Sequence, residues 1–238
     1  MIPAILLCGR KQVGKDTTAR FIESLMVGYY PDKLKRTVSI AQSDPMKDFC
    51  RDALNMGVAQ LWGNEKEKDI GKPRADVEKM ELWARDLLRA LPTHREMAIR
   101  ALHIWWGGIP KVTTPRHILQ TLGTEWGRKV DPDLWANHAW RRVYEELAEG
   151  TPGGLGIPAN LVVVTDGRFR NEVLAAKRNG AHVVKIQRGT ALIDRHASET
   201  GLDDVPTFWF DEVITNDGTL AELQVNVRLM LTELGYIR

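Results

Sequence analysis

The segment from Gly9 to Lys15 combines two glycines and a lysine in a spacing that suits phosphate binding. It matches the pattern G-x-x-x-x-G-K, follows an apolar run and precedes residues with helical periodicity. In such a loop, consecutive backbone N–H groups surround a phosphate, and the start of the helix adds the positive end of its dipole. Glycine permits backbone conformations that a β-carbon would obstruct. We therefore predict a P-loop in which Lys15 reaches the β- and γ-phosphates of a nucleotide.

The residue after the lysine departs from the most familiar form of this loop. Asp16 stands where Ser or Thr normally offers a hydroxyl to Mg²⁺, and Thr17 and Thr18 follow it. Asp16 could bind the metal through water or interact with an attacking phosphate. Alternatively, its charge only complements the positive N-terminus of the helix. The sequence leaves these interpretations open.

A second group of candidate residues follows the most strand-like run of the chain. Residues 161–165 are almost entirely β-branched or apolar, and Asp166 comes directly after them. In a parallel sheet, ligands bind beyond the carboxyl ends of the strands, where an acid can hold Mg²⁺ or its water shell. The alternative is that Asp166 caps the following helix. Because Arg168 and Arg170 follow at once, with donors suited to phosphate oxygens, we favour catalytic roles for all three.

A third segment lies between these two in the sequence. Arg116 and Gln120 are four residues apart, which places them on one face of a predicted helix. Together they could contact an anionic group and the hydrogen-bonding edge of a base. The segment alone is equally typical of an amphipathic surface helix.

The elements that must position these residues alternate along the chain. Strands are predicted at residues 5–8, 37–41, 161–165, 182–186 and 211–215. Helices are predicted at 15–28, from 44 onward with Asp44 as the cap, and at 77–91, 94–105, 113–123, 132–149, 172–179 and 220–234. Since such alternation forms βαβ units, we predict an α/β fold of the three-layer P-loop NTPase type. Its mostly parallel five-stranded sheet would be flanked by helices.

The middle of the chain has a different character. Residues 56–112 are rich in charge and tryptophan and show helical patterns but no convincing strand. We expect a single domain, residues 1–238, in which a helical insertion at about 56–150 covers the substrate. A surface loop at 150–154 would follow it. Core packing is the expected role for most of the tryptophans. Seven of the eight lie in this region: Trp62, Trp83, Trp105, Trp106, Trp126, Trp135 and Trp140.

Composition excludes several classes of protein. The formal net charge is +2, from 33 basic and 31 acidic residues, so the chain as a whole does not attract nucleic acid or anionic membranes. Cys8 and Cys50 cannot form a disulfide framework, and no apolar run approaches the roughly 20 residues of a membrane span. We expect a cytoplasmic protein with no membrane partner and no stable nucleic-acid binding.

Five motifs in a fixed order resemble the deoxynucleoside monophosphate kinases of tailed bacteriophages. They are G-x-x-x-x-G-K-D-T-T at 9–18, R-x-x-L-Q-x-L-G-T-E at 116–125, D-L-W at 133–135, D-x-R-x-x-x-E at 166–172, and V-I-T-N-D-G-T-L at 213–220. Each motif alone is weak, whereas the ordered set is specific and spans nearly the whole chain. G-K-D-T is the form that this family uses, so Asp16 fits the resemblance.

The resemblance implies a P-loop kinase that transfers the γ-phosphate of ATP to a deoxynucleoside 5′-monophosphate with Mg²⁺. Such an enzyme supplies nucleotides for phage DNA synthesis in the host cytoplasm, and a homodimer is a further candidate state. Together with the loop pattern, the resemblance assigns ATP binding to Gly9, Gln12, Gly14, Lys15, Asp16, Thr17 and Thr18. It assigns metal binding, directly or through water, to Asp16, Thr17 and Asp166. It assigns the acceptor to Lys11, Arg74, Arg116, Gln120, Gly123, Thr124, Trp135, Asp166, Arg168 and Glu172. The expected catalytic residues are Lys15, Asp16, Asp166, Arg168 and Arg170.

Three alternatives remain at this stage. The loop alone also suits another small-molecule P-loop kinase, such as a dephospho-coenzyme A or phosphomevalonate kinase. A nucleic-acid-stimulated P-loop NTPase would require a basic binding surface, which the balanced charge disfavours. A binding module without catalysis would not need both Lys15 and Asp166.

Overall fold

The computed structural model describes residues 1–29, 36–148, 158–189 and 200–238. The predicted loop at 150–154 lies outside these ranges. Contacts divide the chain into two compact units, which we describe separately. The sheet unit comprises Met1–Gln42 and Ala136–Arg238, and the helical unit comprises Ser43–Trp135.

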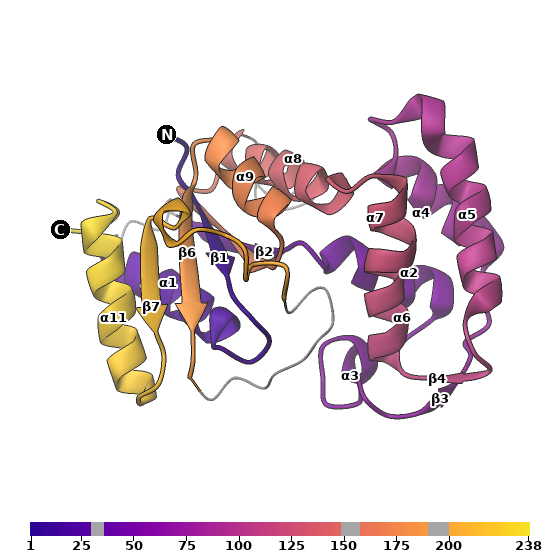
Figure 1. Cartoon of the computed structure of the whole chain (residues 1–238), viewed down its shortest axis with the longest axis horizontal. Helices are drawn as coiled ribbons and strands as arrows, with labels where there is room; N and C mark the ends of the chain where they lie inside the picture. Colours follow the sequence, from indigo (N-terminus) through magenta and orange to yellow (C-terminus); the bar gives the residue numbers. More distant parts are fainter. Residues whose placement is uncertain (30–35, 149–157, 190–199) are drawn as a thin grey trace. The chain divides into compact units, whose positions relative to one another are not determined.

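The sheet unit contains five parallel strands in the order β2-β5-β1-β6-β7 (Figure 1). The bounds are β1 Ala4–Cys8, β2 Thr37–Ala41, β5 Leu161–Gly167, β6 His182–Gln187 and β7 Glu212–Thr215. All five residues of β1 are buried, as are the first five of β5. Strands covered on both faces need apolar side chains at every position, which explains their continuous apolar sequences. The predicted α/β class and parallel five-stranded sheet are confirmed.

Two pairs of helices complete three layers in the sheet unit. Helices α1 (Lys15–Tyr29) and α11 (Leu220–Glu233) share a core with Ile5 and Leu7 of β1. Helices α8 (Leu134–Ala148) and α9 (Arg170–Arg178) contribute to a second core that contains Leu6 and Cys8. Because successive side chains of a strand point to opposite faces, the alternation along β1 assigns each pair of helices to its own face.

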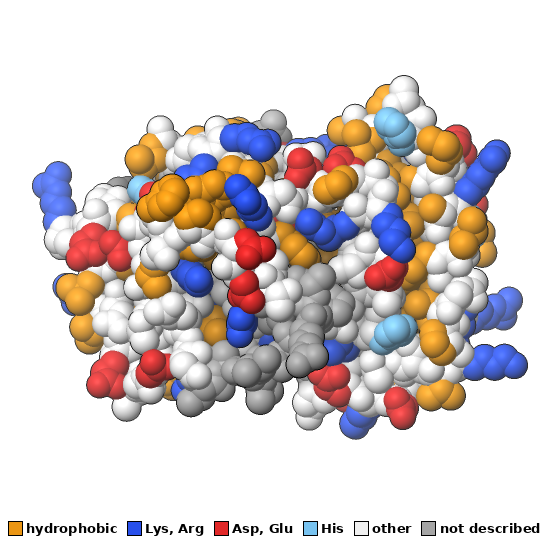
Figure 2. Space-filling model, viewed as in Figure 1, with side chains coloured by type: hydrophobic (Ala, Val, Ile, Leu, Met, Phe, Trp, Pro, Cys, Tyr) orange, Lys and Arg blue, Asp and Glu red, His pale blue; other side chains and the backbone are white. Residues whose placement is uncertain are grey.

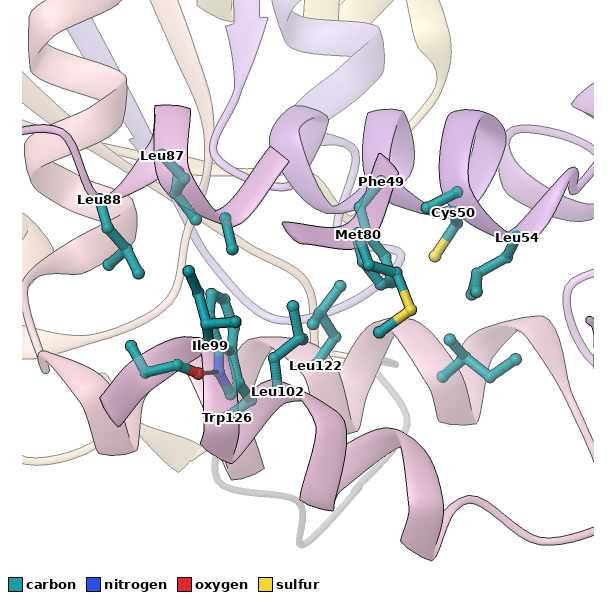
Figure 3. Close-up of a cluster of buried hydrophobic side chains, with 14 of the residues drawn as sticks. Phe49, Cys50, Leu54, Met80, Leu87, Leu88, Ile99, Leu102, Leu122 and Trp126 are labelled. Atoms are coloured by element: carbon teal, nitrogen blue, oxygen red, sulfur yellow. Dashed lines mark hydrogen bonds between the residues drawn. The ribbon is translucent and has the colours of Figure 1, made fainter. Parts of the chain in front are cut away.

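The helical unit is built around a core of apolar and aromatic side chains (Figure 3). Its helices are α2 Asp44–Leu54, α3 Val58–Leu61, α4 Val77–Leu87, α5 Arg95–Gly108, α6 Pro115–Thr121 and α7 Arg128–Val130, with a 3₁₀ turn η1 at Pro92–His94 and a π-helix η2 at Leu122–Gly127. Phe49, Met80, Leu102 and Trp126 are among its fully enclosed side chains.

Most tryptophans of this unit pack against one another. Ring centroids lie 4.7 Å apart for Phe49 and Trp83, 5.4 Å for Trp83 and Trp126, and 6.3 Å for Trp126 and Trp135. The indole N–H of Trp126 donates to the Ala98 carbonyl at 2.9 Å, so the buried ring keeps its polar group satisfied. The excess of tryptophan is therefore mainly a feature of this core, although Trp62 is 43% exposed.

The structure corrects several details. Residues 56–112 were expected to hold no strand, yet β3 (Ile70–Gly71) pairs antiparallel with β4 (Val112–Thr113). Strands of two residues are too short to produce a periodic pattern. Ser43, rather than Asp44, occupies the N-cap position of α2.

The boundaries of the helical unit also differ from the expected insertion at about 56–150. Helix α2 precedes that insertion in sequence but supplies Phe49 and Cys50 to its core, so the unit begins at Ser43. It ends at Trp135, early in α8. The single-domain organisation stays a prediction.

Charge is mixed on the visible face of both units. On the face shown in Figure 2, acidic and basic side chains are interspersed over each unit. Within the described ranges, no helix is both long enough and apolar enough to cross a membrane.

Candidate active site

The predicted P-loop joins β1 to α1 and contains three residues with positive φ. These are Gly9 at 148°, Gln12 at 62° and Gly14 at 103°. A β-carbon on Gly9 would lie 2.4 Å from the Ile186 carbonyl oxygen, so only glycine fits there. The Gly9 N–H donates to the Gly167 carbonyl at 3.1 Å, which places the start of the loop against the end of β5. The two predicted phosphate-handling segments therefore meet at the carboxyl edge of the sheet.

Lys15 is the first residue of α1, and its side chain turns back over the loop. Its Nζ donates to the carbonyl oxygens of Gly9 at 2.8 Å and Arg10 at 2.6 Å, and the residue is only 6% exposed. An ammonium group with three donors can exchange such carbonyls for phosphate oxygens with little movement. This arrangement suits the role predicted for Lys15.

The two residues after Lys15 differ sharply from Thr18 in exposure. Asp16 is exposed and Thr17 partly exposed, whereas Thr18 is fully buried. The Thr18 N–H donates to the Gly14 carbonyl at 2.8 Å, but its Oγ1 has no hydrogen-bond partner among the described residues. Leaving a buried hydroxyl unpaired costs about 1–3 kcal/mol, so a ligand oxygen at this position would be stabilising.

Asp166 occupies an irregular position near the end of β5. Its φ is 67°, and the pairing of β1 with β5 shifts register between Leu6 and Cys8. Extra residues of this kind redirect side chains at the ends of strands and are frequent beside active sites. Phe169, and not Asp166, occupies the N-cap position of α9, so the capping alternative for Asp166 is wrong.

Glu172 holds the turn that carries Arg168. Its Oε2 accepts hydrogen bonds from the backbone N–H groups of Arg168 at 2.7 Å and Phe169 at 3.0 Å, and the residue is 5% exposed. A carboxylate that accepts two backbone donors fixes the conformation of the segment between them. Glu172 thus positions Arg168 in this structure, and its predicted contact with the acceptor stays a prediction.

Arg10 in the loop and Arg170 at the start of α9 contact residues from a later part of the chain. The guanidinium of Arg170 lies 4.9 Å from the ring centroid of Trp209. Arg10 donates to both carboxylate oxygens of Asp203, at 2.9 and 3.0 Å. No role was predicted for Arg10 or Asp203, because nothing in the sequence indicates a pairing across 193 positions.

Cys8 ends β1 immediately before the loop and is fully buried. Burial raises the pKa of its thiol above the ordinary range, and the nearby Glu172 carboxylate raises it further. Its sulfur lies close enough to Gly167 that a β-carbon there would be 2.7 Å away. The thiol therefore stays protonated and serves packing rather than catalysis.

In the helical unit, the predicted acceptor residues follow one another through α6 and η2. Arg116 lies in the first turn of α6, where its Nε is 2.5 Å from Glu67 Oε1. The Gln120 carbonyl accepts a hydrogen bond from Thr124 Oγ1 at 2.9 Å. A π-helical turn such as η2 is rare and recurs at functional sites.

Gly123 and Trp135 are linked directly. The Trp135 indole N–H donates to the Gly123 carbonyl at 2.9 Å, and Trp135 is 4% exposed. Stacking on a base requires an exposed ring face, which this conformation does not offer. The structure thus gives Trp135 a packing role, and its predicted contact with the acceptor stays a prediction.

Arg74 lies apart from this segment, beside a hollow of about 320 Å³ within the helical unit. The lining residues are Leu54, Asn55, Met56, Gln60, Ile70, Gly71, Pro73 and Arg74. The lining of the hollow combines apolar residues with Asn55, Gln60 and the guanidinium of Arg74. Its relation to the acceptor stays a prediction.

The predicted residues therefore form two groups. The sheet unit brings the loop residues from Gly9 to Thr18 to the same sheet edge as Asp166 and the turn after it. Lys11, which is partly exposed, belongs to this group. The helical unit gathers Arg116, Gln120, Gly123, Thr124 and Trp135 along α6, η2 and the start of α8.

Two residues with candidate roles were missed. Gln42 follows the last residue of β2, Ala41, which pairs with Thr165 of β5. The Oε1 atom of Gln42 is buried and has no hydrogen-bond partner within the described part of the chain. Asn216 follows β7, and its Nδ2 donates to the Val13 carbonyl of the loop at 2.8 Å. Asn216 stands in one of the motifs above, but a motif does not show which backbone group its amide meets.

Comparison with known proteins gives consistent matches. The family model described as deoxynucleotide monophosphate kinase matches residues 93–227, more than half of the chain. The chain is 27% identical over 224 residues to a candidate deoxynucleotide monophosphate kinase of Acanthamoeba polyphaga mimivirus, covering 91% of this chain and 89% of the relative. It is 27% identical over 252 residues to the deoxynucleotide monophosphate kinase of Escherichia phage RB69, covering 95% and 98%. These matches confirm the resemblance drawn from the motifs.

Proposed function

The chain belongs to the deoxynucleotide monophosphate kinase family, and from this premise we propose that it transfers the γ-phosphate of ATP to a deoxynucleoside 5′-monophosphate. The observation that carries the proposal is the loop between β1 and α1. Its positive-φ residues and the buried Lys15 ammonium form a phosphate site, and the Gly9–Gly167 hydrogen bond joins that site to the turn containing Asp166.

Phosphoryl transfer requires positioning and charge stabilisation more than covalent chemistry from the protein. A phosphate monoester oxygen of the acceptor is already an anionic nucleophile near neutral pH, so no strong general base is needed. The bond from this oxygen to the γ-phosphorus forms as the bond to the β,γ-bridging oxygen breaks, and ADP leaves. Lys15 and Arg168 neutralise charge on the transferring group, and Arg170 assists after leaving the face of Trp209.

Mg²⁺ belongs to this proposal because the residues at the sheet edge suit a hard cation. Asp16, Thr17 and Asp166 offer carboxylate and hydroxyl oxygens, and Asp16 is exposed at the start of α1. When bound, the metal would offset the negative charge of the phosphate groups. The three residues would hold it directly or through water.

Acceptor binding is assigned to Lys11 and to the α6–η2 segment of the helical unit. Arg116 would exchange its contact with Glu67 for the acceptor phosphate, since a guanidinium binds either anion with the same paired donors. Gln120 lies one turn further along the same face and would read the base edge. Exclusion of water from the bound substrates would matter, because water otherwise competes for the phosphoryl group. A cytoplasmic location and a homodimer are further parts of the proposal.

The test is a coupled assay of ADP release with Mg·ATP against dAMP, dCMP, dGMP, dTMP and modified pyrimidine monophosphates. The proposal requires ADP to appear only when an acceptor is present, and the preferred acceptor identifies the base. Lys15→Ala should abolish the signal, whereas Lys129→Ala, which removes an exposed lysine paired with Glu125, should not. Hydrolysis that ignores the acceptor, or that DNA stimulates, would contradict the proposal. Size-exclusion chromatography with light scattering tests the dimer.

A further inference from the structure

Asn216 joins three parts of the sheet unit that are distant in sequence. It is the first residue after β7 and is 8% exposed. Its backbone N–H donates to the Gln187 carbonyl at the end of β6, at 2.8 Å. Its side-chain Nδ2 donates to the Val13 carbonyl in the loop, also at 2.8 Å, across 203 positions. Asn216 therefore connects the loop to the ends of β6 and β7.

The hydrogen bond to Val13 also determines where the next N–H group points. The Val13 carbonyl and the Gly14 N–H belong to one planar trans peptide and point in opposite directions. With the carbonyl held by Asn216, the Gly14 N–H must point away from Asn216. It then faces the side of the loop where a phosphate can accept it.

Without such a restraint, this peptide could turn over easily. Gly14 has φ of 103°, and glycine adopts positive and negative φ with similar ease. A turned peptide would present a carbonyl oxygen to the phosphate in place of an N–H group. The Asn216 side chain also packs directly on Gly14, since a β-carbon there would lie 2.4 Å from Nδ2. Gly14 allows the loop conformation, but it also lets the Val13–Gly14 peptide turn over. The hydrogen bond from Asn216 supplies the restraint that this peptide needs.

We propose that Asn216 is a positioning residue for ATP, which fixes the Val13–Gly14 peptide so that the loop donates to phosphate. This inference rests on the proposed function in one respect, the identity of the ligand as the triphosphate of ATP. Asn216 acts through the loop backbone. Binding of the acceptor nucleotide does not depend on it.

The test measures ATP and acceptor binding separately, by calorimetry on the full-length protein. Mg·ATP is titrated without an acceptor, and the acceptor found in the ADP-release assay is titrated without ATP. The variants are Asn216→Ala and the isosteric Asn216→Asp. The control is Asn226→Ala, which removes a partly exposed amide of α11 that meets the Thr215 carbonyl at 3.5 Å.

Loss of one hydrogen bond predicts that Asn216→Ala weakens ATP binding about five- to tenfold. Asn216→Asp keeps the shape but places a carboxylate against the Val13 carbonyl, so its loss is larger. Acceptor affinity should stay within about twofold of the unchanged protein, and Asn226→Ala should match that protein for both ligands.

Two results would overturn the inference. One is an Asn216→Asp protein that binds ATP as the unchanged protein does. The other is an equal loss of ATP and acceptor binding together with a lowered melting temperature, which would assign Asn216 to general stability. If Asn216→Ala does not fold, Asn216→Asp and its ratio of ATP to acceptor affinity decide alone. If the protein binds ATP but phosphorylates no monophosphate, the proposed function is wrong. The ATP titrations still decide the role of Asn216 in that case.

Discussion

At the scale of single residues, the candidate site consists of side chains that already contact other groups of the protein. Lys15 contacts loop carbonyls, Arg170 lies on Trp209, and Arg116 contacts Glu67. Each of these contacts can be exchanged for a phosphate oxygen. Glu172 differs, because its two backbone hydrogen bonds position Arg168 in a buried setting.

Arg168 gives the clearest prediction at this scale. Arg168→Ala should lower kcat about 100-fold or more, because it removes charge stabilisation at the transferring phosphate. ATP affinity should change little, since the loop residues remain. Steady-state kinetics and an ATP titration measure the two effects.

The matched control is Arg178→Ala, which removes an exposed arginine from the last turn of α9, the helix that follows Arg168. It should retain normal kcat. A near-normal kcat for Arg168→Ala would remove this arginine from the catalytic residues.

At the scale of elements, the helical unit depends on close packing between η2 and the start of α8. A β-carbon on Gly127 would lie 2.3 to 2.8 Å from atoms of the Trp135 indole. That ring is 4% exposed and cannot move aside without disturbing Trp126, whose centroid is 6.3 Å away. Gly127 is therefore required by packing, not by its backbone conformation.

Gly127→Ala should destabilise the protein by about 1–3 kcal/mol, the usual cost of an overpacked core. Gly107→Ala is the matched control, because Gly107 lies in helix α5 and a β-carbon added there would meet nothing within 4 Å. It should cause no loss, since alanine favours helix over glycine. Urea unfolding midpoints compare the two variants. Equal midpoints would show that the Trp135 ring yields at little cost.

The same elements show what the sequence could and could not predict. Strands β1 and β5 are continuous apolar runs, and the loop motif is local, so both were placed within a few residues. Strands β3 and β4 have two residues each, and the π-helix η2 continues the helical pattern of α6, so periodicity could not identify either.

The contacts that support the site could not be predicted from the sequence for a different reason. The pairs Arg10–Asp203 and Asn216–Val13 join residues 193 and 203 positions apart. Their geometry depends on the strand order, which places β6 next to β1 and β7 next to β6 although the sequence separates β1 widely from both. The motif predicts which residues bind phosphate, whereas the fold determines which contacts hold those residues in place.

At the scale of the whole molecule, the two ends of the chain meet in the sheet unit. The Tyr236 hydroxyl lies 2.9 Å from His182 Nδ1 and donates to the Ala4 carbonyl at 3.3 Å. The rings of His182 and Tyr236 are also in edge contact, with centroids 5.4 Å apart. Strands β1 and β6 and the C-terminal residues are therefore joined through Tyr236, which contacts His182.

This junction predicts a pH dependence of stability. Burial lowers the pKa of His182 below its ordinary value of 6.5; Asp211 raises it, whereas Lys177 and the N-terminal ammonium lower it. Below pH 6.5 the unfolded chain binds a proton that the folded protein resists, so the contribution of His182 to stability falls as the pH drops from 6.5 through the folded-state pKa. Above pH 6.5 both states hold a neutral imidazole and this contribution is constant.

His182→Gln should therefore flatten part of the acid side of the stability profile. The measurement is the free energy of unfolding in urea between about pH 5 and 8 for the unchanged protein and the variant, with His117→Gln as the control. His117 is exposed on α6 in the helical unit, so its replacement should leave the slope unchanged. The carboxylates are common to all three proteins, so the differences between the profiles report the replaced histidine and its interactions, including that of His182 with Asp211. If His182→Gln and His117→Gln give the same slope below pH 6.5, the junction of the chain ends does not sense pH, and other titratable groups set the acid side of the profile.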